Sequence, residues 1–152
     1  MKNIILILVL TLLSFESYAQ QQYEVKVITS VESIVPNGLG RSRLISANEQ
    51  RDYQDFTSTQ TDDDNTRNKS KRKDIRVKDF EETKLLNFYN IGGIRFQNIA
   101  ANDAVIESKI NAMLAEGWDL AFVTSAVESD AGDKDGQGIF ITRYIFRRPV
   151  QN

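Results

Sequence analysis

The stretch Ala115–Ser125, AEGWDLAFVTS, predicts the end of a helix followed at once by a strand. Gly117 stands where helices commonly close with a residue in the left-handed conformation. Trp118 comes next, where its ring can pack back on the last helical turn. The apolar and β-branched residues that follow favour an extended chain. This stretch therefore predicts a helix and a strand packed against each other.

The segment Asn102–Glu116 has the pattern of an amphipathic helix. Asp103 is a residue type suited to an N-cap. The apolar residues recur at i, i+4, i+7 and i+8, which places Ile106, Ile110, Met113 and Leu114 on one face. We expect this face to lie on a sheet.

Two strands are predicted after the helix, at Trp118–Val127 and Ile139–Arg147. Both faces of the second strand are apolar, with Ile139, Ile141 and Ile145 on one and Phe140, Tyr144 and Phe146 on the other. A strand that is apolar on both faces is typical of the interior of a sheet covered on both sides. We therefore expect a central strand here, paired with its predecessor in a hairpin.

The first half of the chain contains one clear strand signal, in Tyr23–Val31, where β-branched residues alternate with polar ones and Ile28 is the exception. A turn is predicted at 36–40. The segment 57–74 lacks aliphatic and aromatic residues, and we expect it to be disordered or mobile. Around Gly92 and Gly93, the segment Leu85–Ile99 fits a second hairpin or a packed irregular loop.

Together these elements predict a single α+β domain over residues 20–152. The order is strand, loop, a hairpin in the 85–99 segment, helix, strand, strand, with the helix on one face of an antiparallel sheet. One helix covers one face only. The other face must be covered by the 85–99 segment, by a second copy of the protein, or by a partner.

Residues 1–19 have the layout of a secretory signal peptide, with Lys2 before a short apolar run and Ala19 at the cleavage position. We expect an exported protein, periplasmic or extracellular, without a membrane span in its mature form. The chain of 152 residues has no cysteine and no histidine, and its net charge is −2. This composition excludes thiol and imidazole chemistry and provides no basic field for nucleic acid.

The acidic loop Asp130–Gly138, DAGDKDGQG, is the one stretch that resembles a calcium site. With Asp133 and Asp135 at the third and fifth positions of an EF-hand loop, Ala131 and Thr142 fall at the first and twelfth. The leading Asp and the bidentate Glu are both missing. We expect a hairpin loop without metal, unless the carboxylates of Asp130, Asp133 and Asp135 converge.

The turn Gly38–Arg43, GLGRSR, is the second candidate for a ligand site. Its glycines free backbone N–H groups, and Arg41 and Arg43 could hold a carboxylate or a phosphate. Trp118 could serve as a platform for such a ligand. A surface turn is the more ordinary interpretation of the arginines, and packing after Gly117 that of the tryptophan.

Three short motifs resemble the small bacterial DUF4177 domain. They are Tyr23–Val27 (YEVKV), Glu116–Leu120 (EGWDL, with Asp119 where the family usually has Glu) and Ile145–Arg148 (IFRR). The long segment between Ile34 and Ala101 departs from the short family form. The resemblance implies a compact helix-on-sheet domain without established catalytic residues or cofactors.

The sequence thus favours a non-enzymatic binding or interaction module of the bacterial envelope or exterior. Its partner would be another envelope or extracellular protein, or a second copy of the chain. The alternative is a ligand-binding protein or hydrolase that uses the Gly38–Arg43 turn together with carboxylates.

Overall fold

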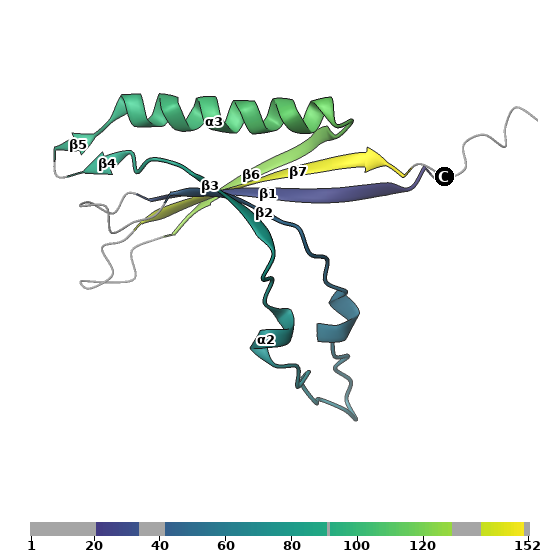
Figure 1. Ribbon diagram of the computed structural model, residues 1–152. Helices are drawn as coiled ribbons and strands as arrows, with labels where there is room; N and C mark the ends of the chain where they lie inside the picture. The colour runs from purple at the N-terminus through teal and green to yellow at the C-terminus, as the bar shows by residue number, and fades with distance from the viewer. Residues whose placement is uncertain (1–20, 34–41, 91, 129–137, 151–152) are drawn as a thin grey trace, which may run out of the picture.

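The computed structural model describes residues 21–33, 42–90, 92–128 and 138–150 (Figure 1). Within these ranges a five-stranded antiparallel sheet has the order β3-β2-β1-β7-β6. Its strands are β1 (Tyr23–Ser33), β2 (Arg43–Ala47), β3 (Phe80–Lys84), β6 (Asp119–Val127) and β7 (Ile139–Pro149). The long helix α3 (Phe96–Ala115) lies along one face. This architecture confirms the predicted α+β fold.

The connection between β2 and β3 forms an arm, residues 48–79, that projects from the sheet on the side away from α3 (Figure 1). It contains a 3-10 turn, η3 (Tyr53–Phe56), and the short helix α2 (Arg72–Ile75). Hydrogen bonds link its two sides, and the amide of Asn68 donates to the carbonyl oxygens of Asp55 and Thr57. The whole of 57–74 is exposed, and its predicted mobility stays a prediction.

The strands β1 and β7 form the centre of the sheet, paired from Tyr23↔Pro149 to Ser33↔Ile139. The prediction that Ile139–Arg147 is a central strand is therefore confirmed. The strands β2 and β3 were not predicted, because each has only five residues and polar residues interrupt their apolar pattern. Of the two alternatives for 85–99, a hairpin or an irregular loop, the structure has a short hairpin, the pair β4 (Tyr89–Asn90) and β5 (Gly93–Ile94).

The helix ends as predicted. Gly117 has φ +82°, and its N–H donates to the carbonyl of Leu114 at 3.0 Å. The N–H of Trp118 donates to the carbonyl of Met113, also at 3.0 Å. These two bonds define a Schellman motif, which reverses the chain so that the indole of Trp118 returns to the core.

The predicted helix start was wrong. The helix begins at Phe96 with Arg95 as N-cap, so Asp103 lies inside it rather than at its end. Ala100 and Ala101 have high helix propensity, and the helix continues through them toward its N-terminus. Leu114, predicted to face the core, is 47% exposed.

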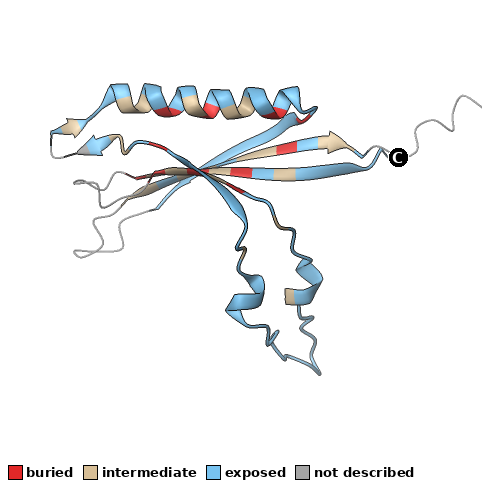
Figure 2. Ribbon diagram, in the orientation of Figure 1, coloured by how far each residue is buried: buried red, intermediate tan, exposed pale blue. Residues whose placement is uncertain are grey.

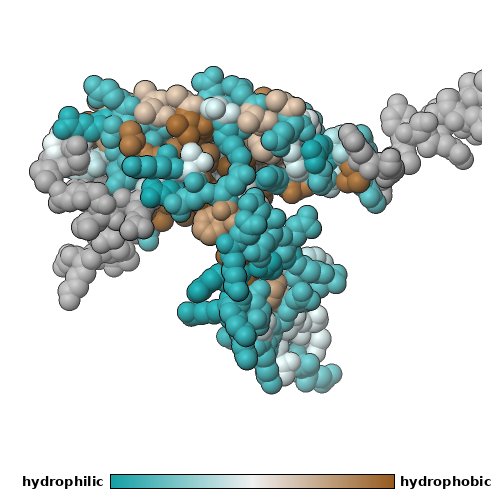
Figure 3. Space-filling model, viewed as in Figure 1, coloured by the Kyte–Doolittle hydropathy of each residue, from teal (hydrophilic) through white to brown (hydrophobic). Residues whose placement is uncertain are grey.

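The core is small and lies between α3 and the sheet. Its buried apolar residues are Ile28, Leu44, Leu85, Ile106, Met113, Trp118 and Phe146. Figure 2 shows the buried positions of α3 on its side toward the sheet and an exposed arm below. In Figure 3 the arm surface is largely hydrophilic, whereas hydrophobic residues show between α3 and the sheet.

In β1 the face with the regular series of apolar residues, Tyr23, Val25 and Val27, is exposed, and the opposite face is buried. Ile28, the exception in the pattern, is 2% exposed, whereas Val25 on the opposite face is 62% exposed. The reason is tertiary: α3 brings Ile106 and Met113 to the face that carries Ile28. Packing of the helix therefore overrides the local pattern of the strand.

Candidate functional site: the open face of the sheet

The face of the sheet that turns away from α3 carries a set of apolar side chains, and we call it the open face. Strand register and alternation assign its members. They are Tyr23, Val25, Val27, Thr29 and Val31 of β1, Arg43, Ile45 and Ala47 of β2, Phe80, Glu82 and Lys84 of β3, Asp119, Phe122, Thr124 and Ala126 of β6, and Ile141, Arg143, Ile145 and Arg147 of β7, with the charged residues other than Arg143 toward the ends of the strands or on the outermost strand.

Several large side chains of the open face are accessible to solvent. Val25 and Phe122 are each 62% exposed, and Phe80 is 47% exposed. Single exposed apolar residues are normal on protein surfaces, but a contiguous apolar patch marks an interaction site. Here Phe122 is paired with Ile145 and Ile145 with Val27, while Phe80 is paired with Ala47 and lines one hollow with Val27 and Ala47, so apolar side chains form a continuous row across the five strands.

The segment 85–99 does not cover this face. Its residue Leu86 is held to α3 by Asn102, whose Oδ1 accepts from the Leu86 N–H at 2.7 Å and whose Nδ2 donates to the Leu86 carbonyl at 2.8 Å. The same amide donates to Glu32, on the helix side of β1. The segment therefore lies on the helix side, and the first of the three predicted ways to cover the second face is wrong.

An apolar hollow of about 360 Å³ lies on the open face at the base of the arm. Its lining includes Val27, Ile45 and Phe80 from three neighbouring strands, and Val77 from the arm. The arm leaves the sheet on the open side, so it forms one wall beside the patch (Figure 1). The hollow is wide enough for an apolar side chain of a partner.

Two arginines of β7 bring positive charge onto this apolar surface. Arg143 is exposed, and the residues directly opposite it in the neighbouring strands are Thr29 and Thr124. Its neighbours along β7 on the same face are Ile141 and Ile145. Arg143 is thus a cation surrounded by neutral side chains. Arg147 differs, because its guanidinium stacks over the ring of Tyr23, 5.0 Å from the centroid.

The predicted arginine–tryptophan ligand site is not assembled. Arg41 lies outside the described residues, and the Arg43 Nε–H donates to Glu82 Oε1 at 2.7 Å in an ion pair. Arg43 is paired with Val31 of β1. Asp119, which follows Trp118, is paired with Arg147, and Arg147 is paired with Val25 of β1. Six residues along β1 separate Val25 from Val31, about 20 Å at about 3.3 Å per residue.

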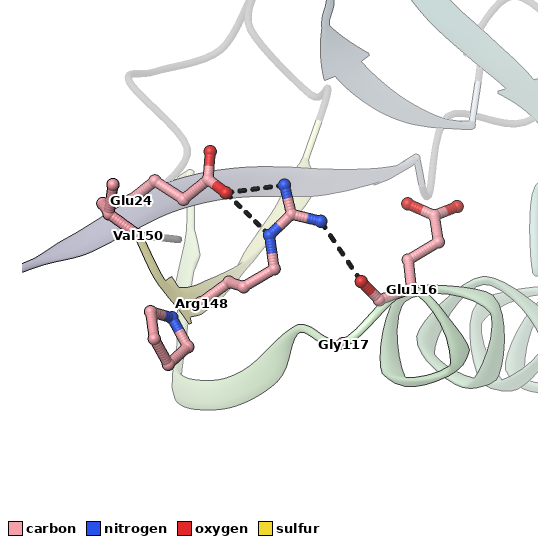
Figure 4. A pocket seen from close by; sticks show the side chains of 6 residues that line it. Glu24, Glu116, Gly117, Arg148 and Val150 are labelled. Atoms are coloured by element: carbon pink, nitrogen blue, oxygen red, sulfur yellow. Dashed lines mark hydrogen bonds and ion pairs between the residues drawn. The ribbon is translucent and has the colours of Figure 1, made fainter. Parts of the chain in front are cut away.

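Trp118 has a structural role instead. It is 7% exposed, and the Arg148 guanidinium lies over its ring, 4.4 Å from the centroid. The Arg148 Nε–H donates to Glu24 Oε1 at 2.6 Å, and Nη1–H donates to the Glu116 carbonyl at 3.2 Å (Figure 4). Arg148 therefore ties the helix end to β1. These contacts hold the guanidinium at the side of the neighbouring pocket in a structural role.

An ion pair outside the open face joins the helix to the sheet. Lys109 of α3 pairs with Glu81 of β3 at 2.8 Å, and this ion pair lowers the pKa of the Glu81 carboxyl. Burial raises the pKa of the Tyr144 hydroxyl on the helix side.

Within the described ranges no three Asp or Glu side chains are grouped as metal ligands. The acidic loop with Asp130, Asp133 and Asp135 lies outside those ranges.

Sequence reasoning missed Arg143, Val25 and Phe122 as functional candidates. For Arg143 the signal was available, since strand alternation places it on the same face as Ile141 and Ile145. For Val25 and Phe122 the sequence contained no such signal, because the face that α3 covers is determined only when the whole chain is folded.

No family model, curated protein or solved structure matches this chain. The resemblance to the DUF4177 domain therefore stays a prediction. Among the helices that the structure describes, none has both the length and the apolar composition to span a membrane.

Proposed function

We propose that this protein is an exported, non-enzymatic interaction module of the bacterial envelope or exterior, and that its open face binds a protein partner. The observation that carries the proposal is the contiguous apolar patch of the open face, with Val25 and Phe122 each 62% exposed. Burial of such side chains contributes about 1.5–3 kcal/mol each relative to full exposure, so a few of them can sustain a specific complex.

The chemistry of the open face also defines the partner. Arg143 stands among neutral side chains, and the hollow beside Phe80 accepts an apolar group. A complementary surface presents apolar side chains around at least one carboxylate, which would form a charge-assisted hydrogen bond with the guanidinium. An apolar centre with an arginine is also the composition that protein interfaces favour.

Site-specific photo-crosslinking tests this proposal. A photoreactive amino acid replaces Val25 on the open face in one variant and Ser108 on the exposed side of α3 in the other. After irradiation in the native host, we expect a discrete adduct of higher mass from position 25 and none from position 108. Loss of that adduct on Arg143→Ala would support the carboxylate contact.

Two results would contradict the proposal. One is the same adduct pattern from both positions, and the other is no adduct at position 25 in a protein that is exported and folded. Export itself is tested separately, by fractionation of cells that express the full chain.

A further inference from the structure

Strand β6 has the sequence of an interior strand but lies at an edge of the described sheet. From Leu120 to Val127 it reads LAFVTSAV, with no charged residue and no proline. Every residue of β6 is exposed. Natural edge strands are usually protected by charge, proline, shortness or cover, and β6 has only a bulge between Leu120 and Phe122.

The opposite edge shows the protection that β6 lacks. Strand β3 has five residues, FEETK, of which three are charged. Glu82 pairs with Arg43 of β2, and Glu81 pairs with Lys109 of α3. The second ion pair joins the middle of α3 to β3, whereas the residues of β6 are exposed on both faces of the strand.

Three residues of β6 direct backbone N–H and C=O groups to the free edge. The N–H of Glu128 donates to the carbonyl of Ile139 at 3.0 Å, so Glu128 is directed at β7. Antiparallel pairing alternates, and the groups of Val127, Ser125 and Val123 therefore point outward. A neighbouring strand could satisfy them.

We propose that β6 pairs antiparallel with β6 of a second copy, about a two-fold axis normal to the sheet. A strand of this kind is self-complementary, since antiparallel pairing with itself closes as an isologous contact. The result is a continuous ten-stranded sheet with both helices on one side. The contact uses the edge rather than the open face, and it does not rest on the function proposed above.

The sizes and charges of the β6 side chains select one register for the two paired β6 strands. With the axis at Thr124, Phe122 lies opposite Ala126 and Val123 opposite Ser125 of the second copy. Large residues then face small ones, and Glu128 faces Leu120 rather than another charge. The outward-directed groups of Val123 and Ser125 meet as a hydrogen-bonded pair, as the alternation requires. This register also pairs the uncharged run of β6 with itself.

The first test is the mass of the purified protein by light scattering over a range of concentrations. We expect a dimer that dissociates on dilution. Val123→Lys should raise its dissociation constant at least about tenfold, which corresponds to about 1.4 kcal/mol. The matched control, Thr83→Lys on the β3 edge, should leave the dimer unchanged. Circular dichroism checks that both variants fold.

The second test reports the register and does not depend on the lysine variants. The chain has no cysteine, so Thr124→Cys introduces a single thiol. At the axis the two Cα atoms would be about 4.5 Å apart, within the range of a disulfide. We expect a disulfide-linked dimer on mild oxidation of Thr124→Cys and none with Ser108→Cys. A wild-type monomer at all concentrations, a dimer unaffected by Val123→Lys, or no preferential cross-link at position 124 would overturn the proposal.

Discussion

Both faces of the sheet have apolar side chains, but the two faces differ in how far those side chains are buried. On the helix side, Phe146 is 0% exposed and packs with residues of α3, whereas Phe122 on the open side is 62% exposed. The difference arises from the number of helices and not from the strands. Apolar residues beneath the helix stabilise the fold, while several of those on the open side are accessible to solvent, as the proposed binding role requires.

The largest expected effect comes from truncating the same residue type on each face. Phe146→Ala removes a fully buried ring and should lower the free energy of unfolding by about 3–5 kcal/mol. Phe122→Ala removes an exposed ring and should cost less than about 0.5 kcal/mol, as surface substitutions usually do. Urea denaturation of both variants measures this. Equal losses would mean that the open face is part of the folded core.

The helix end provides a smaller effect, specific to the helix side. Gly117→Ala forces a left-handed conformation on a residue with a Cβ and should cost about 1–2 kcal/mol. A Cβ there would meet only Arg148 Cδ at 3.8 Å, so the cost is conformational rather than steric. Asn tolerates this conformation better, and Gly117→Asn should therefore lose less. Thermal unfolding should rank the three proteins glycine, asparagine, alanine.

The smallest effect concerns pH. Because Lys109 lowers the pKa of Glu81, the folded state favours the ionised carboxylate. This stabilisation is present above the ordinary pKa of glutamate, about 4.3, and is lost as pH falls through the lower folded value. The pair is at the surface, so Glu81→Gln should cost less than about 1 kcal/mol at pH 7. Urea midpoints should converge at acidic pH, and a difference that persists there would contradict this assignment.

The elements that the sequence predicted well are those determined by local chemistry. Gly117 and Trp118 specify the helix stop, and the apolar pattern of Ile139–Arg147 specifies a central strand. The helix start was wrong because the helix begins after Arg95, which makes no side-chain cap hydrogen bond, and no cap residue in the sequence marks that position. Strands β2 and β3 were missed because long-range pairing across the arm makes them strands.

The candidate site was less predictable than the fold. Arg41, Arg43 and Trp118 were chosen for local chemistry, yet Arg43 is paired with Glu82 and Trp118 is part of the core. The open face depends on which side of the sheet α3 packs, and for β1 that is the side of Ile28 rather than the side of Val25 and Val27. No local pattern contains that information.

The accessibility of one position on the open face decides whether that face is a binding surface. Val25→Cys introduces a single thiol on the open face, and Ser108→Cys provides an exposed control on α3. In the isolated protein, both thiols should react with maleimide at similar rates. In the native envelope or culture fraction, we expect the thiol at position 25 to be protected at least about tenfold while that at 108 is unchanged. Equal labelling of position 25 in both settings would contradict the account.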